Sequence, residues 1–114
     1  MNKVFFLGAT GIIGKNFYKA LKNKYRIVPT YSKNKIKGYK KFDIINDSLD
    51  HFIKKYGTPI TIILAISISN HDKAAINKKD LIKINYKLII NLLKQIKKYQ
   101  NIKIIFLSTQ MVLN

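Results

Sequence analysis

Residues 3–14 read KVFFLGATGIIG, and this stretch decides the fold. Residues 3–7 form a short apolar run that is typical of a buried β-strand. Three glycines follow at a spacing of three, and residues 12–24 then show the periodicity of an amphipathic helix. The stretch therefore predicts a strand, a tight turn and a helix, which is the arrangement that binds the pyrophosphate of a dinucleotide.

The glycines of this turn have separate roles. Gly8 permits the tight turn, Gly11 lets a pyrophosphate approach the backbone, and Gly14 lets the helix pack close to the sheet. The N-terminus of the helix offers free N–H groups and a positive dipole end to the phosphates. The alternative is a tight turn without a ligand. We expect the turn's cofactor contacts at Gly8, Thr10, Gly11, Ile12, Ile13 and Gly14.

The rest of the chain alternates β-branched runs with amphipathic stretches. The further elements predicted are strands at 25–30, 42–45, 60–68 and 102–107, a loop or degraded helix at 31–41, and helices at 48–56 and 80–99. The nearly continuous apolar run 60–68 is typical of a central parallel strand covered on both faces. In the first helix, Ile13, Phe17 and Leu21 are expected to form the buried stripe. We predict an α/β fold, a Rossmann-type doubly wound parallel sheet of about five strands, truncated after the fifth.

The end of the second predicted strand bears on the choice of cofactor. An acidic residue at this point accepts hydrogen bonds from the ribose of NAD, whereas a basic residue suits the 2′-phosphate of NADP. Ser32 and Lys33 stand here, and no acidic residue precedes Asp43. We therefore expect Ser32 and Lys33 to contact the cofactor and NADP to be preferred, with NAD as the alternative.

The net charge of +17, with a pI of about 10.1, is the footprint expected of a nucleic-acid binder. Composition weakens that interpretation, because 21 of the 22 basic residues are lysine and isoleucine also occurs 21 times. Both residues have codons poor in G and C. Arginine, the side chain best suited to bidentate phosphate contacts, occurs only as Arg26. Nucleic-acid binding is therefore the least favoured hypothesis.

Several classes of protein are excluded or disfavoured by what the sequence lacks. Without cysteine there is no disulfide or thiolate metal site, and two histidines are too few for a histidine-rich metal cage. No segment reaches the roughly 18 apolar residues of a membrane span, and the N-terminus is unlike a signal peptide. We expect a cytoplasmic protein without a metal.

Five segments of the chain resemble the extended short-chain dehydrogenases/reductases, the superfamily of NAD-dependent epimerases and dehydratases. The glycine turn has their GxxGxxG spacing. Residues 42–47, FDIIND, are similar to the LDITD segment of the dTDP-4-dehydrorhamnose reductase type. Residues 63–74 fall in register with its INAAAYTxVDKA stretch, Asn85 with an asparagine of its long helix, and residues 108–113, STQMVL, with STDYVF.

The resemblance implies that residues 1–114 are the N-terminal portion of an NAD(P)-binding Rossmann domain. It places Asp43, with Ile44, near the adenine, and Ala65, Ile66 and Ser67 beside the nicotinamide. Thr109 takes the place of the catalytic hydroxyl, with Ser108 as the alternative.

In this family, hydride transfer also needs a tyrosine and a lysine four residues later, on a helix after the fifth strand. That helix and the substrate domain are absent from residues 1–114, so we expect no turnover from this chain alone. The implied partners are a dinucleotide, a nucleotide-sugar substrate in a complete protein, and a second copy or a completing chain. A non-catalytic regulatory or interaction subunit with the same fold is the second hypothesis.

Overall fold

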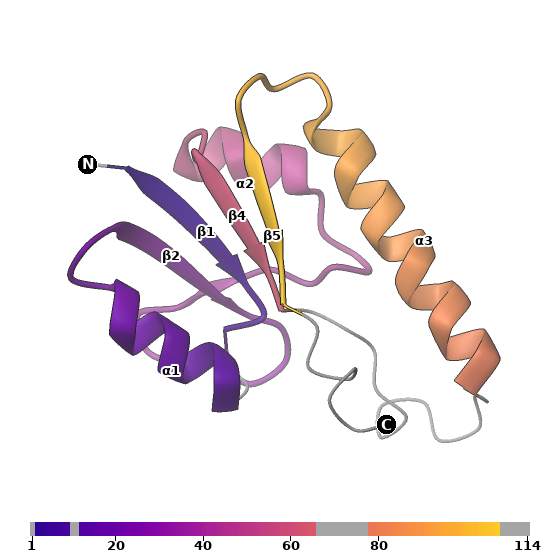
Figure 1. The fold of residues 1–114 in the computed structure, drawn as a ribbon, viewed down its shortest axis with the longest axis horizontal. Coiled ribbons are helices and arrows are strands. Elements are labelled where there is room, and N and C mark those ends of the chain that lie inside the picture. Colours follow the sequence, from indigo (N-terminus) through magenta and orange to yellow (C-terminus); the bar gives the residue numbers. More distant parts are fainter. Residues whose placement is uncertain (1, 10–11, 66–77, 108–114) are drawn as a thin grey trace.

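A computed structural model describes residues 2–9, 12–65 and 78–107 of the chain. Strands and helices alternate along it, except that a loop and no helix joins β2 to β3 (Figure 1). The elements are β1 (Lys3–Leu7), α1 (Ile12–Leu21), β2 (Arg26–Tyr31), β3 (Lys40–Lys41), α2 (Leu49–Tyr56), β4 (Thr61–Leu64), α3 (Lys78–Ile96) and β5 (Lys103–Phe106).

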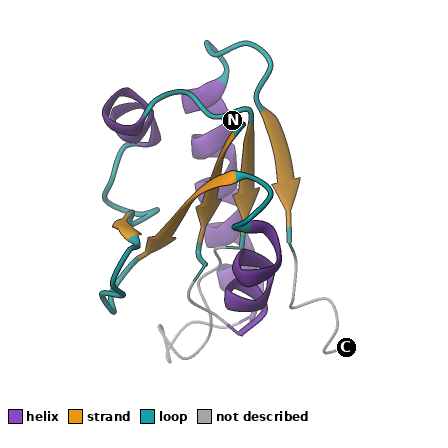
Figure 2. Ribbon diagram, turned by 90° about the vertical axis from the view of Figure 1, so that its left-hand side faces the viewer, coloured by secondary structure: helices purple, strands orange, loops and turns teal. Residues whose placement is uncertain are grey.

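The five strands form one parallel sheet in the order β3-β2-β1-β4-β5. From β1 the chain winds outward through β2 to β3, then crosses to the other side of β1 and continues through β4 to β5. Figure 2 shows α1 and α2 on opposite sides of the sheet. The doubly wound Rossmann-type sheet predicted from the sequence is confirmed.

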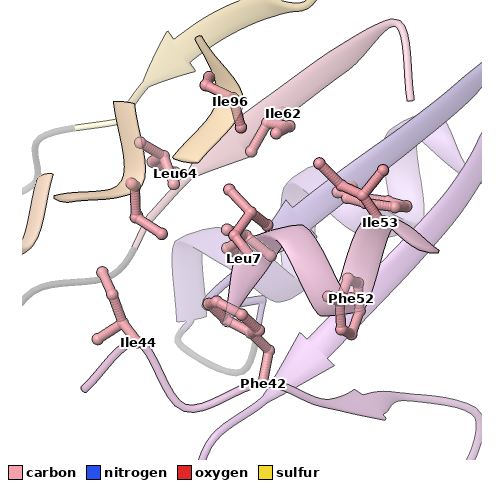
Figure 3. Packing of buried hydrophobic residues seen from close by; sticks show 11 residues of the cluster. Leu7, Phe42, Ile44, Phe52, Ile53, Ile62, Leu64 and Ile96 are labelled. Carbon is pink, nitrogen blue, oxygen red and sulfur yellow. The ribbon is translucent and has the colours of Figure 1, made fainter. Parts of the chain in front are cut away.

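Side chains of the central strands divide between two cores, because successive residues of a strand point to opposite faces. Phe5 and Leu7 lie in the larger cluster beneath α2 and α3, whereas Val4 and Phe6 lie in a smaller cluster on the α1 face. In the larger cluster (Figure 3), the ring of Phe52 meets that of Phe5 edge to face at 5.0 Å between centroids. Both faces of β1 are therefore covered.

The strand predicted at 60–68 is the central strand β4, but it covers only Thr61–Leu64, and Ile60 and Ala65 lie outside it. Ile62 and Leu64 belong to the larger cluster and Ile63 to the smaller one. Residues 66–68 lie outside the described part of the chain.

The prediction of a third strand at 42–45 is wrong. β3 is Lys40–Lys41, and a turn follows it. The carboxylate of Asp43 accepts hydrogen bonds from the backbone N–H of Ile45 and from the side-chain amide of Asn46, both at 2.9 Å. The burial of Phe42 and Ile44 is compatible with a strand and with a turn. The hydrogen bonds that the side chain of Asp43 accepts from nearby residues favour the turn.

The predicted buried stripe of α1 is wrong at Phe17, which is 43% exposed. Its neighbour Tyr18 is half-buried, and the ring of Tyr18 packs against that of Tyr39 at 5.5 Å, in an edge arrangement. Leu21 packs against the smaller cluster, as expected. The aromatic pair joins the loop between β2 and β3 to α1.

The two edges of the sheet differ in character. β3 consists of two exposed lysines. β5 has large apolar side chains instead, and Ile105 and Phe106 are 40% and 47% exposed. Among the described residues, the apolar edge is therefore β5.

The N-terminus of α2 is capped from two elements. Ser48 is the N-cap, and its hydroxyl accepts a hydrogen bond from the N–H of His51 at 3.2 Å. The amide oxygen of Gln95, on α3, accepts hydrogen bonds from the N–H groups of Leu49 at 2.6 Å and Asp50 at 3.2 Å. The first N–H groups of a helix have no partner within it, so Gln95 supplies acceptors that α2 lacks and joins α2 to α3.

We predict that Gln95→Ala lowers the free energy of unfolding by about 1–2 kcal/mol, because two helix-terminal N–H groups lose their acceptor. Urea denaturation measures the change. Gln100→Ala, at an exposed position after α3, is the matched control and should change stability by less than about 0.5 kcal/mol. Equal effects of the two variants would contradict the capping role.

A second, ionic contact joins α2 to the turn that follows α3. The carboxylate of Asp50 accepts a hydrogen bond from the hydroxyl of Tyr99 and lies 3.0 Å from the ammonium of Lys98 and 3.2 Å from that of Lys54. The Tyr99 hydroxyl, followed by Lys98 and Lys54, holds the pKa of Asp50 well below its ordinary value of 3.8. The charged carboxylate is therefore favoured in the folded chain.

A carboxyl group whose pKa is lowered by folding adds stability above its unfolded pKa, and that stability is lost as the pH falls. We expect the free energy of unfolding to fall as the pH drops below about 4, and Asp50→Asn to show a shallower dependence. Tyr99→Phe, which keeps the three charges, should give an intermediate slope. Urea titrations between neutral pH and acid measure it, and parallel curves for all three proteins would refute the assignment.

Candidate functional site

The carboxyl ends of the parallel strands lie together, where the arrowheads point in Figure 1. We call this side of the sheet, which is distinct from the outer strands β3 and β5, its carboxyl edge. Leu7 and Leu64 are register partners at the ends of β1 and β4. The N–H of Ala65 donates to the carbonyl of Leu7 at 2.9 Å, so the loop after β4 begins beside the glycine turn. The helices that come next after β1 and β4, α1 and α3, cover opposite faces of the sheet, and such a switch point is where open α/β sheets bind ligands.

The glycine turn has the geometry that its sequence predicts at both described glycines. Gly8 has a φ of +83°, a conformation that other residues rarely adopt. A Cβ at Gly14 would lie 3.0 Å from the backbone of Ala9 and from the carbonyl oxygen of Gly8. Gly8 thus turns the chain, and Gly14 lets α1 approach the turn closely.

Thr30, near the end of β2, holds the turn from the opposite side. Its hydroxyl accepts a hydrogen bond from the N–H of Gly8 at 3.1 Å and donates to the carbonyl of Phe6 at 3.3 Å. Its backbone carbonyl accepts from the N–H of Ala9 at 3.3 Å. Sequence analysis missed this residue, although a threonine in an otherwise apolar strand segment was the available signal.

The predicted specificity residues follow β2 directly. Ser32 and Lys33 are exposed in the loop that leaves the carboxyl edge of the sheet. The N–H of Phe42 donates to the carbonyl of Tyr31 at 2.9 Å, which brings the start of the turn at residues 42–46 beside the end of β2. Ser32, Lys33 and Asp43 are therefore neighbours of this edge, as a binding site for the adenosine end would require.

Asp43 and Ile44 have structural functions in the described chain. Burial raises the pKa of Asp43, but its hydrogen bonds to Ile45 and Asn46 and the nearby Lys41 outweigh burial and lower that pKa overall. The side chain of Ile44 lies in the larger cluster, so any cofactor contact by Ile44 is limited to its backbone (Figure 3).

The other predicted site residues differ in how far the structure describes them. Ile12 and Ile13 form the first turn of α1, and Ala65 packs half-buried against the smaller cluster. The remaining residues lie outside the described part of the chain: Thr10, Gly11, Ile66, Ser67, Ser108 and Thr109.

The described residues lack two further features. No helix among them is long and apolar enough to cross a membrane. They also contain no group of three or more histidine, aspartate or glutamate side chains that could hold a metal ion.

The sheet and its glycine turn define a Rossmann-type α/β protein. Residues 4–113 match the model of the NAD dependent epimerase/dehydratase family, and the chain belongs to this family. No curated protein sequence matches the chain.

Solved structures resemble the chain over nearly its whole length. A hypothetical dTDP-4-dehydrorhamnose reductase from Sulfolobus tokodaii is 28% identical, with a TM-score of 0.63 over 95% of this chain and 39% of that one. L-Threonine 3-dehydrogenase from Trypanosoma brucei is 22% identical, with a TM-score of 0.71 over 96% of this chain and 37% of that one. UDP-glucose 4-epimerase from Brucella ovis, in complex with NAD, is 20% identical, with a TM-score of 0.68 over 93% and 35%. The chain thus spans less than half the length of these relatives.

We predict that Gly14→Ala destabilises the chain by about 1–3 kcal/mol, because the added methyl meets backbone that cannot move aside. Helix propensity alone would give the opposite sign, a gain of about 1 kcal/mol. Asn16→Ala, at an exposed position of the same helix, is the control and should be neutral or stabilising. Urea denaturation separates the cases, and a stabilised Gly14→Ala would show that α1 does not press on the turn.

Proposed function

We propose that residues 1–114 form the NAD(P)-binding portion of an oxidoreductase of the nucleotide-sugar reductase and epimerase type. The observation that carries this proposal is the turn at the switch point, where Gly8 has positive φ and Gly14 leaves no room for a side chain. Such a turn brings backbone N–H groups and a helix N-terminus to a phosphate. The family match and the NAD in the complex of a related epimerase support a dinucleotide as the ligand.

Different residues at the carboxyl edge would bind different parts of the proposed cofactor. The glycine turn, with Thr10, Gly11, Ile12 and Ile13, would bind the pyrophosphate. Asp43 and the backbone of Ile44 would approach the adenine, and Ala65, Ile66 and Ser67 the nicotinamide. The dinucleotide supplies the hydride acceptor or donor when it is bound.

NADP is the proposed preference within this site. Ser32 and Lys33 are exposed where the chain leaves β2, and acidic side chains are absent from residues 1–42. A hydroxyl and an ammonium at this point suit the dianionic 2′-phosphate, whereas the ribose diol of NAD is usually met by a carboxylate.

Thr109, with Ser108 as the alternative, is proposed as the hydroxyl that bonds the reacting oxygen of a nucleotide-sugar substrate. The tyrosine and lysine that the family uses for proton transfer are not in residues 1–114, so the proposal assigns this chain binding and orientation. A cytoplasmic location and association with a second copy or a completing chain belong to the same proposal. A non-catalytic subunit would use the same binding site without the chemistry.

The distribution of lysines favours a dinucleotide over nucleic acid as the ligand. Lysines lie on α1, on one face of the sheet, and on α2 and α3, on the other. A nucleic-acid interface gathers its basic residues on one face.

We expect saturable binding of NADPH to the purified chain, followed through the fluorescence of the nicotinamide. Lys33→Ala should weaken NADPH binding about tenfold, the equivalent of one charge-assisted hydrogen bond. The same variant should leave NADH binding unchanged, because NADH lacks the 2′-phosphate.

Lys24→Ala is the matched control, since this exposed lysine precedes β2 and so lies near the amino ends of the strands, away from the proposed site. It should bind both cofactors as the unmodified chain does. No saturable change at millimolar NADPH or NADH would refute the proposed function. Equal weakening of NADPH and NADH by Lys33→Ala would refute the NADP preference alone.

A further inference from the structure

Thr30 is the buried polar residue among those the structure describes, and its side chain is fully buried. Threonine hydroxyls near strand ends often bond to backbone close by in sequence. The hydroxyl of Thr30 instead joins residues 22 and 24 positions away, at Gly8 and Phe6. These contacts cross from β2 to the end of β1, so they act on the glycine turn and not on the local course of β2.

The direction of the hydroxyl group is fixed by its two partners. Its proton goes to the carbonyl of Phe6, so a lone pair is left for the N–H of Gly8. With the bond from the N–H of Ala9 to the backbone carbonyl of Thr30, two successive N–H groups of the turn are taken by one residue. Both lie where the chain leaves β1 with the positive φ of Gly8.

These bonds also restrict how the turn can hold a phosphate. The N–H groups of Gly8 and Ala9 are already used, so the donors for a phosphate must come after Ala9 in the chain. On the α1 side, Gly14 lies so near the turn that a Cβ there would be 3.0 Å from the backbone of Ala9 and Gly8. The start of the turn, at Gly8 and Ala9, is therefore held between Thr30 on β2 and Gly14 on α1.

We propose that Thr30 is a positioning residue for the pyrophosphate of the dinucleotide, acting through its hydroxyl on Gly8. This inference rests on the proposed function and deepens it. Removing the hydroxyl leaves the Gly8 N–H without its acceptor inside the protein, and the turn then gains freedom that a bound pyrophosphate must remove again.

Thr30→Val replaces the hydroxyl by a methyl of similar size. We expect it to weaken NADPH binding about tenfold, the equivalent of one hydrogen bond of about 1.4 kcal/mol. Binding of adenosine 2′-phosphate, which has no pyrophosphate, should be unchanged. A general loss of structure would weaken both ligands, so the difference between them reports on the turn.

Two comparisons complete the experiment. Thr30→Ser and Thr30→Ala both remove the methyl, but only the serine keeps the hydroxyl, so serine should retain NADPH affinity within about twofold and alanine should lose it. This pair decides the matter if the valine variant does not fold. Thr61→Val, at the amino end of β4, makes the same change away from the turn and should bind NADPH normally.

The outcomes separate the two proposals. If the unmodified chain and the Thr30→Val variant bind NADPH equally well, the role of Thr30 is overturned and the proposed function stays intact. Equal weakening of NADPH and adenosine 2′-phosphate also overturns it. An unmodified chain that binds neither ligand overturns the proposed function, and the role of Thr30 with it.

Discussion

The requirement that β1 be covered on both faces governs the rest of this structure. Val4, Phe5, Phe6 and Leu7 are all buried, so neither face of the strand can meet water. Parallel neighbours on both sides satisfy its backbone, and the connections between parallel strands must cross over the faces. The helices that make these crossovers supply the two cores. The glycine turn follows this strand directly, so the burial of β1 fixes where the turn begins.

The few acidic residues show how the high charge is compatible with a defined structure. The chain has five acidic residues, and three of them fall within positions 43–50. Asp43 and Asp47 accept the hydrogen bonds of the turn after β3, and Asp50, on α2, contacts Lys54 of the same helix and Lys98 and Tyr99 just after α3. Lysine occurs on all three helices, whereas these three carboxylates lie where backbone N–H groups or several donors need an acceptor. The charge of the chain as a whole says little about its ligand, whereas the placement of its acids explains local structure.

Short-range patterns predicted much of the fold and part of the site. The apolar runs at 3–7 and 60–68 identified two central strands, and the spacing of Gly8, Gly11 and Gly14 identified the turn. The misplaced third strand reflects local contacts, because Asp43 accepts the hydrogen bonds of a turn from Ile45 and Asn46. In α1, Phe17 is exposed and Tyr18 packs against Tyr39, a contact from outside the helix that no periodicity within α1 contains. Thr30 likewise acquires its importance from Gly8, 22 residues earlier, and its own strand gives no sign of the partner.

The two outer strands of the sheet, β3 and β5, differ in how well they could pair with an additional strand. At β3 the sheet ends in two lysines, whose solvation and mutual repulsion discourage an additional strand. At β5 the exposed Ile105 and Phe106 are successive residues and so lie on opposite faces. A strand added there must carry apolar side chains on both of its own faces to exclude water from both. An added strand therefore fits β5 better than β3, and an amphipathic strand with one polar face would fit β5 poorly.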